Sequence, residues 1–190
     1  MEDSRPALRR RCQQLRANLS SKYQQRASLK VCERIRGLEQ YQQAKHVAVY
    51  QASDGEISLE SLWKSAEEEK FYYFPVVVEN KKLLFLPAKA STPFSKNRYG
   101  IEEPEVPRSQ AVAANDLDLI FLPLVAFDDF GTRLGRGAGY YDRSLADIAH
   151  PLLIGLAYEF QHLSYIEPAS WDVPLSGVIT PNTIYWSKKA

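Results

Sequence analysis

Cysteine is scarce in this sequence. Among 190 residues there are two cysteines, Cys12 and Cys32, and neither belongs to a CxxC pair or to a cluster of cysteine and histidine. That spacing argues against a zinc site. Both cysteines fall on the apolar faces of predicted helices, so we expect two buried thiols in a reducing compartment.

Long apolar runs and an excess of charge of one sign are also missing. No segment approaches the roughly 20 apolar residues that a membrane span needs, and no apolar stretch follows the arginine-rich start as in a secretory signal. The formal net charge is +1, which does not mark a nucleic-acid binder. We therefore expect a cytoplasmic protein that binds neither nucleic acid nor membrane.

Strands alternate with helices through most of the chain, and this predicts the fold class. Apolar residues make up 45% and charged residues 25% of the sequence, as in ordinary globular domains. The pattern favours a single three-layer α/β/α domain over residues 1–190, with a largely parallel sheet. We expect helices at 4–19, 20–38, 59–69 and 140–148, strands at 46–51, 71–78 (interrupted by Pro75), 83–86, 118–122, 152–157, 177–180 and 184–186, and loops at 87–107 and 124–139.

The first predicted helix carries two adjacent stripes. Arginines at positions 5, 9 and 16 form a narrow stripe beside an apolar one. Because the two stripes are neighbours, these arginines should lie at the rim of the surface that the helix packs against, within reach of a cleft. The apolar stripe consists of Leu8, Cys12, Leu15 and Leu19.

A glycine-rich loop follows the predicted strand 118–122. Gly131, Gly135, Gly137 and Gly139 lie within nine residues, and alternate glycines allow successive amides to point at one anion. In open α/β sheets ligands bind beyond the carboxyl ends of the strands, which is where this loop begins. The segment has neither the GK[ST] ending of a Walker A loop nor the spacing of the dinucleotide fingerprint.

Charged residues complete the predicted phosphate site. Arg133 and Arg136 supply forked donors for phosphate oxygens. Asp142 is the acid inside this basic stretch, and Mg²⁺ that bridges phosphates usually takes one or two carboxylates. The loop therefore predicts binding of a magnesium–phosphate ligand.

The loop and several other blocks resemble one enzyme family. The stretch from Phe127 to Arg143, FDDFGTRLGRGAGYYDR, closely resembles the signature of the 5-formyltetrahydrofolate cyclo-ligases, also called methenyltetrahydrofolate synthetases. The resemblance implies a fold like that of the sugar-phosphate isomerases and coenzyme A transferases. Further similar blocks are the N-terminal arginine-rich helix, YQASDGEI at 50–57, YGIEEP at 99–104, DLI at 118–120 through Pro123, and WDVPL at 171–175.

The resemblance also implies a reaction and its substrates. Relatives convert ATP and 5-formyltetrahydrofolate into ADP, phosphate and 5,10-methenyltetrahydrofolate. The formyl oxygen attacks the γ-phosphate to give an iminium phosphate, and N10 then displaces phosphate. We expect a monomer that accepts the folate with or without a polyglutamate tail, and Mg²⁺ as the cofactor.

Site roles carry over position by position. Arg5 departs from the lysine common in relatives, Gln51 from an apolar residue, and Ala138 receives no side-chain role, while Arg10, Arg11 and Arg16 are expected to be solvated. Arg136 and Tyr140 are the catalytic candidates, and Asp142 and Asp172 the metal ligands. The ATP-binding set is Arg5, Arg9, Arg133, Leu134, Gly135, Arg136, Gly137, Ala138, Gly139, Tyr140 and Tyr141. The folate-binding set is Gln51, Glu56, Arg136, Gly137, Ala138, Gly139 and Tyr140.

Two alternatives remain open from the residues alone. A phosphosugar isomerase on a related fold would need an acid/base pair, for which Glu56 and Asp142 are the best candidates. An RNA-binding module would use the N-terminal arginines together with exposed aromatics. The near-zero net charge argues against the second.

Overall fold

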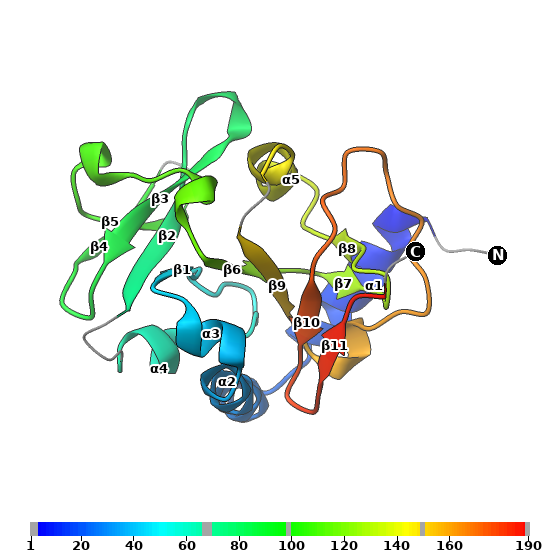
Figure 1. Ribbon diagram of the computed structural model, residues 1–190. Coiled ribbons are helices and arrows are strands. Elements are labelled where there is room, and N and C mark those ends of the chain that lie inside the picture. Colours follow the sequence, from blue (N-terminus) through cyan, green and yellow to red (C-terminus); the bar gives the residue numbers. More distant parts are fainter. Residues whose placement is uncertain (1–3, 66–69, 98–99, 149–150, 189–190) are drawn as a thin grey trace.

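The computed structural model describes residues 4–65, 70–97, 100–148 and 151–188. Within these residues it forms a seven-stranded sheet in the order β11-β10-β9-β6-β1-β2-β3 (Figure 1). The neighbouring strands from β10 to β2 run parallel, and an antiparallel strand closes each edge. The mixed α/β class with a largely parallel sheet is thereby confirmed. The strands are β1 (His46–Ala48), β2 (Phe71–Val77), β3 (Leu83–Ala88), β6 (Leu119–Pro123), β9 (Leu152–Leu156), β10 (Gly177–Ile179) and β11 (Ile184–Trp186).

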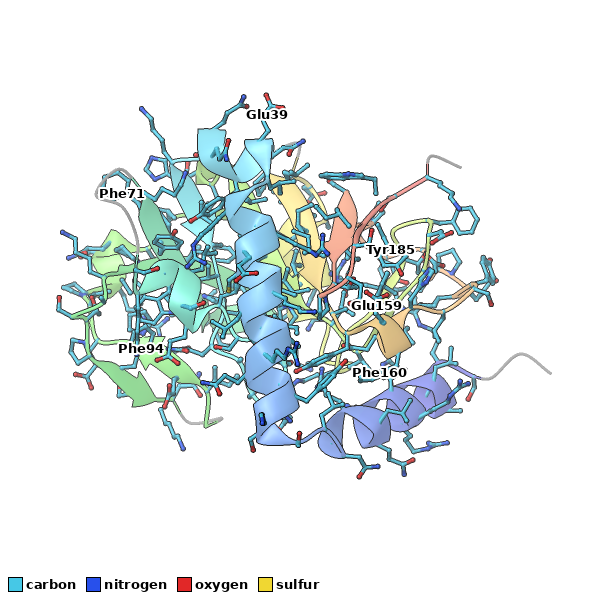
Figure 2. The ribbon with its side chains drawn as sticks, turned by 90° about the horizontal axis from the view of Figure 1, so that it is seen from below. Glu39, Phe71, Phe94, Glu159, Phe160 and Tyr185 are labelled. Atoms are coloured by element: carbon cyan, nitrogen blue, oxygen red, sulfur yellow. The ribbon has the colours of Figure 1, made fainter. Side chains whose placement is uncertain are left out.

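Both faces of the sheet are covered. Side chains alternate along a strand, so Leu119 and Phe121 join the core under the helices α2 (Ser21–Arg36), α3 (Glu39–Gln43) and α4 (Glu60–Trp63). Ile120 and Leu122 join a second core on the opposite face, with Leu145 of the short helix α5 (Tyr140–Leu145). Figure 2 looks onto the first of these faces, and α2 crosses it lengthwise.

Helix α1 (Arg5–Ala17) stands at the side of the sheet. Its Cys12 packs with Val125, Ala126, Leu134 and Ile166 in a third, smaller core. In Figure 2 it projects sideways from the foot of α2, beneath the turn that carries Phe160. Leu8 also packs against this third core, whereas Leu19 packs against the core under α2 and Leu15, predicted to belong to the same apolar stripe, is exposed.

Several predicted elements differ in detail. Helix α3 was missed, and α5 ends at Leu145. Residues 66–69 and 149–150 lie outside the described residues, as does Tyr99 of the predicted YGIEEP block. Pro75 does not interrupt β2, because β1 pairs with β2 only from His46 to Ala48 and leaves that edge of β2 free opposite the proline.

Both predicted loops contain hairpins. The segment 87–107 includes β4 (Phe94–Lys96) and β5 (Glu102–Pro104), and the segment 124–139 includes β7 (Ala126–Phe127) and β8 (Arg133–Leu134). The sequence pattern did not reveal these short strands, because the prolines of the first segment and the glycines of the second are typical of loops. Among the described helices, none is long and apolar enough to cross a membrane.

Candidate functional site

The direction in which the chain adds successive strands to the sheet changes between β1 and β6. After β1 the chain adds β2 on one side, whereas β6, β9 and β10 follow on the other. Such a switch point opens a crevice at the carboxyl ends of the two strands. The segment after β1 carries Gln51 and Glu56, and the segment after β6 leads to the glycine loop. The structure joins them, because Arg136 Nη2 lies 2.8 Å from Glu56 Oε1.

The loop after β1 is held rigidly. The Tyr50 hydroxyl donates to the carbonyl of Ile57 at 2.7 Å, and the Tyr158 hydroxyl donates to that of Gly55 at 2.9 Å. Burial raises the pKa of both phenols, that of Tyr158 to about 12, so both remain donors near neutral pH. Between these anchors Glu56 is only 8% exposed. Its carboxylate is therefore positioned before any ligand arrives.

Arg16 was expected to be solvated, and this prediction is wrong. The residue is 3% exposed. Its Nε donates to Asp54 O at 3.0 Å, its Nη1 donates to Leu124 O at 3.1 Å, and its Nη2 lies 3.9 Å from Glu56 Oε1. Arginine can be buried when its forked donors are matched in this way. Arg16 therefore ties α1 to the segments after both switch-point strands.

The arginine stripe (Arg5, Arg9 and Arg16) lies along the site in sequence order. Arg16 reaches the loop after β1. Arg9 Nε donates to Gly135 O at 2.9 Å, and Arg5 Nη1 pairs with Asp172 Oδ2 at 2.7 Å. Burial and the charge of Arg5 lower the pKa of Arg9. The helix rises about 1.5 Å per residue, so the stripe spans about 16 Å.

Arg136 neutralises the loop after β1. Its Nε and Nη2 lie 3.2 and 2.8 Å from Glu56 Oε1, and its Nη1 lies 2.7 Å from Asp54 Oδ2. Burial lowers the pKa of Arg136, but Glu56 and Asp54 outweigh it and raise that pKa overall. The side chain remains 43% exposed. Arg136, which is predicted to bind phosphate, therefore pairs with Glu56, which is predicted to bind the pterin, on the open side of this loop.

Arg133 faces the protein rather than the open side of the glycine loop. It is 5% exposed, donates from Nη2 to Asp142 Oδ1 at 2.7 Å, and donates from Nη1 to Val173 O. Burial lowers its pKa despite the nearby carboxylates. Leu134 is fully buried in the core beside α1. Both residues of β8 therefore support the loop from behind.

The two predicted metal ligands are each held by an arginine. Asp142 Oδ1 accepts from Arg133, and Asp172 Oδ2 accepts from Arg5 and from Ala169 N, the latter at 2.9 Å. The second oxygen of each carboxylate accepts no hydrogen bond from the described part of the chain. No group of three or more His, Cys, Asp or Glu residues capable of holding a metal occurs there. The available set is two carboxylates with one unengaged oxygen each.

The tip of the glycine loop is open. Arg136, Gly137 and Ala138 are exposed, and a Cβ added to Gly135 or Gly137 would meet no atom within 4 Å. Gly137 and Gly139 adopt φ values of +104° and +68°, which glycine tolerates best. The loop backbone is thus accessible to a ligand at close range.

The tyrosines that follow the loop differ in their surroundings. Tyr140 is partly buried and begins α5. Burial and the charge of Glu56 raise the pKa of Tyr141. Gln51 is partly buried, and its side chain makes no hydrogen bond to the described residues.

Arg143 ends the stretch that resembles the family signature, but no feature of the sequence gave a reason to assign it a role. Arg143 donates from Nη2 to Ala138 O and from Nε to Lys81 O at 3.3 Å, and a Cβ at Gly139 would lie 2.9 Å from its Nη1. It thereby ties the glycine loop to the turn between β2 and β3. That turn is distant in the sequence, and no local pattern signals the contact.

Comparisons with known proteins agree on one family. The model of the 5-formyltetrahydrofolate cyclo-ligase family matches residues 1–181. A 5-formyltetrahydrofolate cyclo-ligase from Haemophilus influenzae is 38% identical over 92% of this chain and 96% of its own, and one from Escherichia coli K12 is 32% identical over 90% and 97%. The NMR structure of Aquifex aeolicus 5,10-methenyltetrahydrofolate synthetase superposes with a TM-score of 0.86 at 31% identity, covering 98% of this chain and 94% of that one.

Proposed function

This chain belongs to the 5-formyltetrahydrofolate cyclo-ligase family, and we propose that it uses phosphoryl transfer from ATP to drive the cyclisation of 5-formyltetrahydrofolate at the switch-point site. The products are 5,10-methenyltetrahydrofolate, ADP and phosphate. The observation that carries the residue assignment is the contact between Arg136 and Glu56. It brings the phosphate loop and the carboxylate suited to the pterin into one site.

The glycine loop binds the ATP phosphates in this proposal. Its open backbone at Gly135 and Gly137 allows close approach of phosphate oxygens. Arg9, whose Nε contacts Gly135 O, lies beside the loop with its remaining donors. Arg133 acts indirectly, because it is buried and positions Asp142. Phosphoryl transfer needs such positioning and charge neutralisation more than a protein nucleophile.

Folate binds beside the loop after β1. Glu56 lines a cavity of about 630 Å³ next to α2 and α4, which is within the usual range for small-molecule sites. A carboxylate accepts hydrogen bonds from the amino and ring N–H groups of a pterin. Arg136 leaves Glu56 and turns to the γ-phosphate when both substrates bind. Gln51 contributes by packing.

Catalysis then proceeds in two displacements. The formyl oxygen attacks the γ-phosphorus, the bond to the β-phosphate oxygen breaks, and ADP leaves. N10 attacks the activated formyl carbon and loses its proton to solvent, and the C–O bond breaks to release phosphate. Arg136 neutralises charge on the transferred group, and the Tyr140 phenol orients it.

The residues present suit Mg²⁺. Asp142 and Asp172 offer hard carboxylate oxygens, each anchored by an arginine through its other oxygen. Two carboxylates are the usual number for Mg²⁺ bound together with nucleotide phosphates. When bound, the ion neutralises phosphate charge and fixes the orientation of the triphosphate of ATP.

The two alternatives are less well supported. An isomerase would rely on Glu56 and Asp142 as acid and base, yet an arginine engages each of them. An RNA-binding module would need the arginine stripe exposed, but Arg16 is buried. A single domain, a monomeric state and a cytoplasmic location remain predictions from the sequence.

An isotope experiment tests the proposed chemistry. With 5-formyltetrahydrofolate labelled with ¹⁸O in the formyl group, the released phosphate should carry one ¹⁸O atom per turnover. Mass spectrometry of the phosphate reads this directly. Unlabelled phosphate, with methenyl product formed, would contradict attack by the formyl oxygen and leave only the overall reaction standing.

A further inference from the structure

Trp171 is unusually exposed for a tryptophan. Its relative exposure is 72%, whereas Trp63 is 4% exposed and Trp186 is 46% exposed. Within the described ranges, no hydrogen bond, ring contact or cation–π contact involves the Trp171 indole. Tryptophan is highly buried on average, so packing does not explain this position.

The backbone that carries Trp171 is nevertheless fixed against the candidate site. Asp172 N donates to Ala169 O at 3.0 Å and closes a turn with Trp171 inside it. The carboxylate of Asp172 pairs with Arg5, and Val173 N donates to Asp142 Oδ1 at 3.3 Å. In Figure 1 this loop, between η4 (Glu159–Gln161) and β10, passes the start of α1 and rises beside β8.

The arginine stripe gives the site a direction. Arg16 marks the end at Glu56, whose carboxylate binds the folate in the proposed function. Arg9 marks the middle at Gly135, and Arg5 marks the other end at Asp172. If the γ-phosphate meets the folate near Glu56, the rest of the nucleotide must extend away from it. That direction leads along the stripe to the turn that carries Trp171.

We propose that the Trp171 indole stacks on the adenine base of ATP and contributes to the affinity for the nucleotide. This inference rests on the proposed function. An indole offers a large flat apolar face, and base stacking on an aromatic side chain contributes substantially to affinity. The anchored turn presents that face with little entropy left to lose on binding. The exposed face of the Trp171 indole is then the surface that the adenine covers when ATP binds.

Fluorescence titration separates base stacking from phosphate binding. The difference between the emission of the wild type and that of Trp171→Phe is the emission of Trp171. We expect Mg-ATP to quench this component, and Mg²⁺ with inorganic tripolyphosphate to leave it unchanged. Trp186→Phe is the matched control, since it removes a partly exposed indole on β11 and should retain the quenching. Equal quenching by ATP and tripolyphosphate, or none by ATP at concentrations that saturate turnover, would overturn the assignment.

Kinetics provide the second readout. Trp171→Ala should raise the KM for ATP about tenfold, with kcat and the KM for the folate changed less than about twofold. Trp171→Phe should restore most of the affinity, because a phenyl ring still stacks. An unchanged KM for ATP in an active Trp171→Ala enzyme, or a rise in the folate KM instead, would refute the inference while leaving the cyclo-ligase function intact. Absence of cyclo-ligase activity in the wild type would instead refute the proposed function, and the fluorescence comparison would still test the stacking.

Discussion

Replacing Arg16 with methionine removes the guanidinium that joins α1 to both switch-point segments. Methionine keeps much of the buried volume, so the lost interactions dominate the effect. Leu124 O keeps a partner, because Gln161 Nε2 donates to it at 3.0 Å. Asp54 O loses a hydrogen-bond donor, and the buried carboxylate of Glu56 loses a compensating positive charge.

The magnitude follows from those two losses. A hydrogen bond to a charged group contributes about 1.5–3 kcal/mol, and breaking a buried ion pair costs up to about 5 kcal/mol. Arg136 still neutralises Glu56, so we expect a loss of about 2–4 kcal/mol in the free energy of unfolding. In a chain of this length that corresponds to a fall in Tm of about 10 °C. Arg16→Lys keeps the charge but cannot reach both carbonyls, and should lose about half as much.

Urea denaturation followed by circular dichroism measures this loss. Arg10→Met is the matched control, because Arg10 is exposed on the same helix and should change stability by less than about 0.5 kcal/mol. Equal urea midpoints for Arg16→Met and Arg10→Met would refute the view that Arg16 is a buried clamp. The KM for the folate should also rise in Arg16→Met, since the loop that holds Glu56 loosens.

Four further substitutions test the glycine loop, a predicted metal ligand and the start of the central strands. Gly135→Ala should leave stability within about 0.5 kcal/mol of wild type yet raise the KM for ATP, because the added methyl meets no protein atom but obstructs a phosphate. Gly137→Ala should cost about 1–2 kcal/mol in urea unfolding because its φ is +104°; equal effects of the two glycine substitutions on stability would contradict this distinction. Asp142→Asn should raise the Mg²⁺ concentration for half-maximal activity at least about tenfold in a metal titration, and an unchanged titration would remove it from the metal site. Partial burial raises the pKa of Asp118, but two backbone amides at the start of β1 outweigh it and lower that pKa overall. Asp118 therefore stabilises the folded state above the ordinary carboxyl pKa, and this stabilisation is lost as pH falls through the depressed value. Urea midpoints measured from pH 7 to pH 3 should fall less steeply for Asp118→Asn than for wild type.

The sequence predicted the layered α/β fold well because its strands and long helices carry strong periods. The glycine loop was recognisable because glycine spacing and charge are local properties. Several partners of the arginines in and after this loop were not, since Glu56, Val173 and Lys81 lie at least 40 residues away in the sequence. Burial of Arg16 was missed for the same reason, because nothing within α1 distinguishes a clamped arginine from a solvated one.

The central claim is tested most directly by mixing the purified protein with 5-formyltetrahydrofolate and Mg-ATP. We expect the near-ultraviolet absorbance of 5,10-methenyltetrahydrofolate to appear, to require both ATP and Mg²⁺, and to collapse in Arg136→Ala and Asp142→Ala but not in Arg10→Ala. No absorbance change from a folded protein, with both substrates shown to be intact, would contradict the proposed function.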